Sequence, residues 1–178
     1  HLNSGTVRIT NNVAEFTDPT ELWALGQVQA VTGLIFTHNT FVGAVSAIGM
    51  GTNTPSPGLM MVDNILDNGA YGLSCLLPGR TFSGCFPRAT FTRNVIVGGS
   101  SHSAVYPRGN TYPPTVAAVG FRDVAGKDFR LSVSSPQRGT SAGGTDPGVN
   151  FSELFRAMGS TWPASWRPGE DVPIKPVR

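Results

Sequence analysis

The sequence predicts an all-β fold, a solenoid of parallel strands in which each repeat of the chain forms one coil. Four segments share a pattern of alternating apolar residues around a central Asn, and these segments recur at a nearly constant interval. Only short pieces with Gly and Pro separate them, and the 178 residues include 22 Gly and 14 Pro. Such a composition is typical of a single domain with many turns.

The repeats read VRITNNVAEF at 7–16, LIFTHNTFVG at 34–43, LMMVDNILDN at 59–68 and ATFTRNVIVG at 89–98. Their central residues are Asn12, Asn39, Asn64 and Asn94, with steps of 27, 25 and 30 residues. Apolar residues stand three positions before each Asn and two positions after it. Those before it are Ile9, Phe36, Met61 and Phe91, and those after it are Ala14, Phe41, Leu66 and Ile96. This alternation indicates strands that bury one face.

The interval between repeats decides how the strands connect. It is too long for a hairpin and too short for a strand–helix–strand unit, which takes about 30 residues or more. One such unit cannot bury its own apolar face, so it has to stack on its neighbours. The sequence therefore predicts one coil of parallel strands per repeat.

The repeated Asn is expected at a tight bend between two strands, in a left-handed conformation that Asn tolerates. Because paired strands lie about 4.8 Å apart, the four amides can bond to one another along the stack as an Asn ladder. The alternative is four unrelated loop asparagines. The preceding residues, Asn11, His38, Asp63 and Arg93, should form an outward column with exposed ion-pair contacts. A metal site with His38 and Asp63 is the alternative for that column.

With these four repeats the chain resembles the right-handed parallel β-helix proteins, the group that includes the pectate lyases. The stretch from Asn110 to Phe151 resembles the final coil of such proteins, and the resemblance as a whole covers residues 7 to about 157. The resemblance implies a right-handed parallel β-helix and a ligand along the outer face of one sheet. It implies no particular activity, because this scaffold carries lyases, hydrolases and adhesins.

The two ends of the repeat region differ. NFSELFRAMG at 150–159 predicts a helix with Asn150 as its N-cap, which would cover the last coil and complete a domain over 1–159. Residues 160–178 predict an extended Pro-rich tail in which Trp162 and Trp166 pack back on the coils or contact a sugar. The first coil has no such cover, so we expect upstream coils, another chain or a second copy to stack on it.

Composition restricts the partners and the compartment. The net charge is +2 and there are two Lys, so no basic stripe indicates nucleic acid, and no apolar run is long enough to span a membrane.

Cys75 and Cys85 enclose a short loop that a disulfide can close, with a gain in stability of roughly 2 to 3 kcal/mol. Two buried thiols are the alternative. The disulfide favours a secreted or cell-surface protein.

Candidate binding residues lie in the segments between the repeats. A polysaccharide is the expected ligand, and the residues suited to binding it are Trp23, Tyr71, Arg80, His102, Tyr106 and Arg108. Asp18, Glu21 and Arg88 are further polar groups there. We predict no cofactor, because phosphate-loop and dinucleotide-binding patterns are missing from the sequence.

Catalytic patterns are weak. A calcium-assisted lyase needs a carboxylate cluster, for which the middle repeats offer Asp63 and Asp67. A glycoside hydrolase needs two separated acids, and Asp18 with Glu21 reads more simply as part of a turn. His102 lies between two Ser, but no nucleophile-elbow pattern accompanies it. Two functions follow: a noncatalytic segment with a structural, adhesive or glycan-binding role, or the C-terminal part of a polysaccharide lyase or related enzyme.

Overall fold

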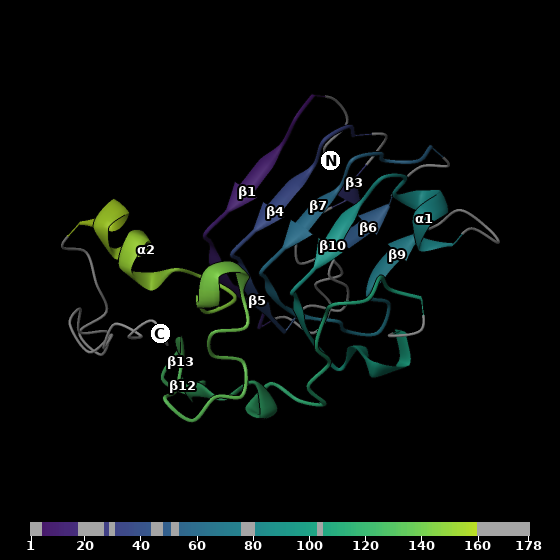
Figure 1. Ribbon diagram of the computed structural model, residues 1–178. Coiled ribbons are helices and arrows are strands. Elements are labelled where there is room, and N and C mark those ends of the chain that lie inside the picture. Colours follow the sequence, from purple (N-terminus) through teal and green to yellow (C-terminus); the bar gives the residue numbers. More distant parts are fainter. Residues whose placement is uncertain are drawn as a thin grey trace.

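Three parallel sheets form the main body of the computed structural model (Figure 1). It describes residues 5–17, 27–28, 31–43, 48–50, 54–75, 81–102 and 105–159. In chain order the strands enter the three sheets in turn: each of the first three repeats adds one described strand to each sheet, and the fourth adds one to the first sheet and one to the second. This arrangement is mostly β and solenoid-like, as the repeat predicts.

The first sheet, in the order β1-β4-β7-β10, faces the viewer in Figure 1. Its strands are Arg8–Thr10 (β1), Ile35–Thr37 (β4), Met60–Val62 (β7) and Thr90–Thr92 (β10). The second sheet contains Val13–Glu15 (β2), Thr40–Val42 (β5), Ile65–Asp67 (β8) and Val95–Val97 (β11). The third contains Gln27–Val28 (β3), Ile48–Met50 (β6) and Leu73–Cys75 (β9).

The register of the strands places equivalent residues of successive repeats side by side. Ile9 pairs with Phe36, Phe36 with Met61, and Met61 with Phe91. On the second sheet Ala14, Phe41, Leu66 and Ile96 pair in the same way. These side chains point inward and form one apolar core, which is why the alternation in the sequence has a period of two.

The repeated asparagines are neighbours in the predicted order. The side-chain amide of Asn12 donates to Oδ1 of Asn39 at 3.0 Å, Asn39 donates to Asn64 at 3.0 Å, and Asn64 donates to Asn94 at 2.9 Å. Asn110 extends this asparagine row by accepting from Asn94 at 2.9 Å. Asn39, Asn64 and Asn94 are fully buried, so each has exchanged water for these bonds.

The prediction that these asparagines are left-handed is wrong. Positive φ angles of 54° to 59° belong to the preceding residues, Asn11, His38, Asp63 and Arg93. The preceding residue makes the bend, and the Asn side chain thereby points inward, where it also bonds the backbone of the neighbouring coil. Nδ2 of Asn64, for example, donates to the carbonyl of Phe36 at 3.0 Å.

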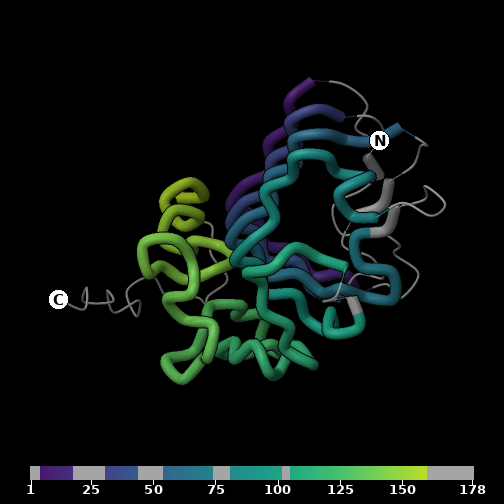
Figure 2. Tube along the Cα trace, turned by 45° about the vertical axis from the view of Figure 1, so that its right-hand side comes forward, coloured from purple at the N-terminus to yellow at the C-terminus, as the bar shows by residue number. Residues whose placement is uncertain are grey.

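The stretch after Asn110 is only briefly a coil. Asn110 and Thr111 stack on the last full coil, and Thr111 bridges Val95 in parallel. The chain then leaves the stack and forms the antiparallel strands β12 (Phe121–Asp123) and β13 (Asp128–Leu131). These pack on the outer face of the second sheet, as the green segment beside the stack in Figure 2 shows.

A second apolar core explains this departure. The outward residues Val42, Ile65, Val95 and Val97 of the second sheet are buried against the C-terminal segment. They meet Val119, Phe121, Phe129, Leu131, Val149, Phe151 and Phe155. A strand that is apolar on both faces needs cover on both sides, and residues 116–155 supply the outer cover.

Helix α2 (Phe151–Met158) forms where it is predicted, and the side chain of Asn150 accepts from the backbone N–H of Glu153 as its N-cap. Its predicted place over the last coil is wrong. Asn150 bonds Asn11 in the first coil, at 2.6 Å from the backbone N to Oδ1. In the last coil Phe91 packs against Phe82 and Tyr106, with ring centroids 5.1 and 5.3 Å apart.

Residues 81–85 contain one turn of helix, α1 (Phe82–Cys85), capped by the Thr81 hydroxyl. Cys85 is fully buried, and the described part of the chain contains no free cysteine. Cys75 ends β9, but its side chain lies outside the described residues. The pairing of Cys75 with Cys85 therefore stays a prediction. The predicted tail at 160–178 also lies outside the described residues.

Candidate ligand-binding groove

A partly open groove with a volume of about 1060 Å³ lies between the first sheet and the C-terminal segment. One wall is formed by outward residues of β1 and β4 and by the bends that follow them. The other wall is formed by residues 138–153 with β13. The groove therefore exists only because the chain returns to the first coil.

The sheet wall carries two threonines, Thr10 on β1 and Thr37 on β4. Both alternate with the inward residues Ile9 and Phe36, so both side chains point outward. Neither hydroxyl has a hydrogen-bond partner within the described part of the chain. Because the two residues pair in the sheet, the wall offers two adjacent hydroxyl groups to a ligand.

The opposite wall is anchored by residues 146–150, which we call the return strap. Gly148 N–H donates to the carbonyl of Asp63 at 2.8 Å, and Val149 N–H donates to Oγ1 of Thr40 at 3.1 Å. Asn11 both accepts from the N–H of Asn150 and donates to its carbonyl, at 2.6 and 3.2 Å. The strap thus crosses the coils from the third repeat back to the first.

The bend residues under the strap form a charged row. Arg93 donates to Asp63 through Nε at 2.9 Å and through Nη2 at 3.4 Å. His38 places Nε2 3.8 Å from the same carboxylate and Nδ1 3.2 Å from the carbonyl of Gly148. The predicted exposed column is therefore only half correct, because the strap leaves Asp63 just 4% exposed.

The same contacts argue for a structural role of His38 and Asp63. Nδ1 of His38 contacts the carbonyl of Gly148, and the Asp63 carboxylate accepts hydrogen bonds from the Arg93 guanidinium. Within the described ranges, no group of three His, Cys, Asp or Glu side chains gathers that could hold a metal ion. The pair serves as an anchor for the strap rather than as a ligand set.

Four arginines line the groove, and they differ in how they are bound. Arg130 is buried and donates to Asp128 through Nε at 2.7 Å and through Nη2 at 2.5 Å. Burial alone would raise the pKa of Asp128, but hydrogen bonds from Arg130 outweigh it and lower the pKa below its ordinary value.

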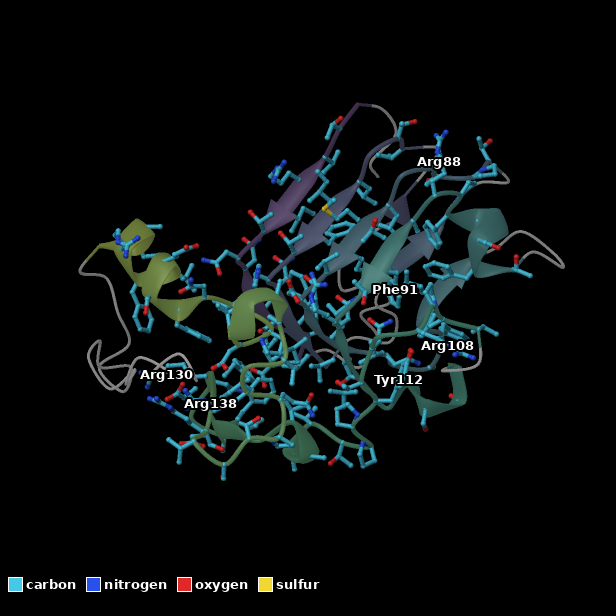
Figure 3. All side chains as sticks on the ribbon, viewed as in Figure 1. Arg88, Phe91, Arg108, Tyr112, Arg130 and Arg138 are labelled. Carbon is cyan, nitrogen blue, oxygen red and sulfur yellow. The ribbon has the colours of Figure 1, made fainter. Side chains whose placement is uncertain are left out.

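Arg138 lies on the same wall of the groove as Arg130, with its Nε 3.8 Å from Oδ2 of Asp146 (Figure 3). Arg8 and Arg122 complete the set.

The candidate sugar-binding residues lie elsewhere or are unsuited to that role. Tyr71 is exposed, at 59%, and Arg108 is exposed beyond the last full coil, but neither lines the groove. Tyr106 is a core residue and not a surface platform. Its hydroxyl donates to Asn68 and accepts from the N–H of Leu73, and burial raises its pKa to about 12. The side chains of Trp23, Arg80 and His102 lie outside the described residues.

Arg88 occupies an unusual backbone position. It has a φ of 59° at the bend before β10, where the equivalent bends before β4 and β7 use Gly33 and Gly58. The structure gives no groove contact for Arg88, which lies far from Arg130 and Arg138 in Figure 3. Asp18 and Glu21 fall outside the described residues.

Sequence reasoning missed the residues that do line the groove, among them Arg8, Thr37 and Arg138. Their common surface depends on contacts between residues as distant as Asn11 and Asn150, which are 139 positions apart. The one available signal was the Arg-containing stretch FRDVAGKDFRLSVSSPQRG at 121–139.

No protein-family model, curated protein or solved structure matches this chain. Among the described helices, none combines the length and the apolar character needed to cross a membrane.

Proposed function

We propose that this chain is a noncatalytic segment of a right-handed parallel β-helix with an Asn ladder, in a secreted or cell-surface protein, and that it binds a polysaccharide. The observation that supports this most directly is the groove of about 1060 Å³, whose sheet wall contains equivalent residues of the first two coils. Adjacent units of an extended polymer can contact equivalent positions of a repeating surface.

The chemistry of the walls suits a sugar chain. Thr10 and Thr37 offer hydroxyls that can both donate and accept, and the opposite wall contains Gly139, Gly143 and Gly144, which allow close approach to the backbone. Ligand sites generally combine such polar groups with apolar surface, here Phe129 and Phe151.

The noncatalytic assignment is supported by the placement of the acidic residues in the groove. A glycoside hydrolase flanks the scissile bond with two carboxyl groups. The carboxylates among the described lining residues, Asp146 and Glu153, both lie on the wall formed by residues 138–153. The alternative, that the chain is the C-terminal part of a polysaccharide lyase or related enzyme, predicts release of unsaturated or reducing ends from a bound polysaccharide.

Binding can be tested with a matched pair of isosteric variants. Thr37→Val removes a hydroxyl from the groove, whereas Thr90→Val removes an outward hydroxyl of the same sheet outside the groove. Val keeps the β-branched shape, so both variants should fold. Affinity electrophoresis in gels containing soluble polysaccharides should show weaker retention of Thr37→Val, by about two- to tenfold in Kd, and unchanged retention of Thr90→Val.

Equal retention of the two variants would place binding elsewhere on the molecule. Absence of retention in any polysaccharide would overturn the proposed function. Formation of new sugar ends during the incubation would favour the enzyme alternative.

A further inference from the structure

We infer that the groove recognises acidic groups on its ligand, carboxylates or sulfate esters, and that Arg138 and Arg8 bind them from opposite walls. This inference rests on the proposed function and adds the chemical class of the ligand. It comes from the arginines that line the groove and from the way in which each of them is already bound.

Arg130 is not available as a primary contact. Two hydrogen bonds tie its guanidinium to Asp128, and the pair is buried. Removing a buried charge from its partner is costly, so a ligand cannot draw Arg130 away. Arg130 instead neutralises the carboxylate of Asp128 beside the groove.

Arg138 is differently placed. Its closest acidic contact is 3.8 Å, from Nε to Oδ2 of Asp146, which exceeds hydrogen-bond length. Asp146 instead uses Oδ1 to accept from the N–H of Gly139 at 2.9 Å. Within the described residues no hydrogen bond involves the Arg138 guanidinium, and its side chain is 25% exposed. It therefore keeps its fork of N–H donors for a planar anion.

Arg8 faces the groove from the other wall. It is exposed on β1, in the first coil, and the described residues give its guanidinium no ion-pair partner. It precedes Thr10 on the same outward face of the strand. A sugar that bonds the threonine hydroxyls can thus present one acidic substituent to Arg8 and another to Arg138.

The charge balance of the groove agrees with this assignment. Its lining residues include four arginines but only two carboxylates, Asp146 and Glu153. Asp128 neutralises one of the four, Arg130, which leaves three arginines against these two carboxylates. Arginine forks bind carboxylate and sulfate oxygens in a bidentate manner, which a neutral hydroxyl cannot match.

The test uses the full chain, three probes and three substitutions. The probes are polygalacturonate, dextran sulfate and neutral dextran. Arg138→Gln removes the proposed contact, Arg156→Gln removes the same charge from an exposed position of α2 outside the groove, and Asp146→Asn removes the competing charge but keeps the oxygen that caps Gly139. Isothermal titration calorimetry gives Kd for each pair, and thermal unfolding checks that each variant is folded.

We expect at least one acidic probe to bind more tightly than dextran and to lose about tenfold in affinity with Arg138→Gln but not with Arg156→Gln. Asp146→Asn should strengthen binding by about threefold, because it removes a repulsive charge near Arg138. Higher ionic strength should weaken binding of the acidic probe. Whether polygalacturonate or dextran sulfate binds identifies the acidic group as carboxylate or sulfate.

Two results separate this inference from the proposed function. If dextran binds as tightly as the acidic probes, or if the Arg138 and Arg156 variants behave alike, the acidic recognition is wrong while polysaccharide binding stands. If none of the three polymers binds, the proposed function itself fails. A loss of affinity in Arg138→Gln that is confined to the acidic probe and fades at high ionic strength is the readout that a purely structural role of Arg138 would not produce.

Discussion

The ring of His38 and the backbone carbonyl of Gly148, 110 positions apart in the sequence, lie 3.2 Å from each other. This contact fixes the return strap over the bend of the second repeat. Together with the bonds from the strap to Asp63 and Asn11, it turns the outer edge of the first sheet into a groove.

The strap can be loosened at Gly148. This residue has a φ of +80°, and a Cβ there would lie 2.5 Å from Oγ1 of Thr40 and 2.8 Å from Cδ1 of Ile65. Gly148→Ala should therefore lower the free energy of unfolding by about 2 to 4 kcal/mol, from backbone strain and overpacking together. Gly144→Ala is the control, because it has a φ of +75° and open space around its Cβ, and should cost about 1 to 2 kcal/mol. Urea denaturation measures both; equal losses would contradict tight packing of the strap.

The asparagine row should contribute most to stability in the middle of the stack. Asn64 is fully buried, accepts from the amide and the backbone N–H of Asn39, and donates to the carbonyl of Phe36. Asn64→Ala leaves these groups unsatisfied and should destabilise the protein by about 3 to 5 kcal/mol. Asn12→Ala, at the exposed first position of the row, should cost about 1 kcal/mol. Thermal and urea unfolding of the two variants compare them directly, and similar losses would argue against a cooperative row.

Tyr106 should make the protein sensitive to alkaline pH. Its folded-state pKa is raised to about 12 by burial, whereas the unfolded value is 10.0. Its contribution to stability is therefore complete below pH 10 and is lost as the pH rises from 10 to 12, by about 3 kcal/mol in total. Denaturant melts at pH 9 and pH 11 measure part of this loss.

The control for that titration is Tyr106→Phe. This variant should be less stable at neutral pH by about 1 to 3 kcal/mol, because the N–H of Leu73 loses its acceptor. It should also lack this residue's share of the alkaline decline. An unchanged decline in Tyr106→Phe would assign the effect to other groups.

The cysteine pair is open to a direct chemical test. We expect no free thiol when unreduced protein is denatured and titrated with a thiol reagent, and two after reduction. Closing this loop should contribute roughly 2 to 3 kcal/mol, so a reductant should also lower the unfolding midpoint. Two reactive thiols in unreduced protein would contradict the disulfide, and the cysteines would then no longer favour a secreted location.

The first coil is the expected contact surface for further coils or another chain. Among the described strands, β1 pairs only with β4 and β2 only with β5. The apolar residues of this edge, Val7, Ile9 and Phe16, are only half-buried. We predict that light scattering will find a concentration-dependent mass above 18.7 kDa. A monomer at all concentrations would mean that this edge needs no second copy.

The stack itself was predictable because it depends on a local pattern. The alternation around Asn39 and Asn64 fixes which side chains point inward, and the interval between them fixes that one coil lies on the next. Both features can be read from the sequence as a periodic pattern. The cap of α2 was predictable for the same reason, since Asn150 and Glu153 lie within one turn.

Local patterns were thus enough to predict the parallel stack, the order of its asparagines and the capped helix. The position of that helix, the residue that makes each bend, the burial of Tyr106 and the place of Arg138 in a groove depend on long-range contacts. These contacts could not be predicted because the stack repeats, whereas the C-terminal segment meets it once. Contacts such as that of Gly148 with Asp63 form when the C-terminal segment buries the outer face of the second sheet. They are not repeated along the chain, so no periodic pattern in the sequence predicts them.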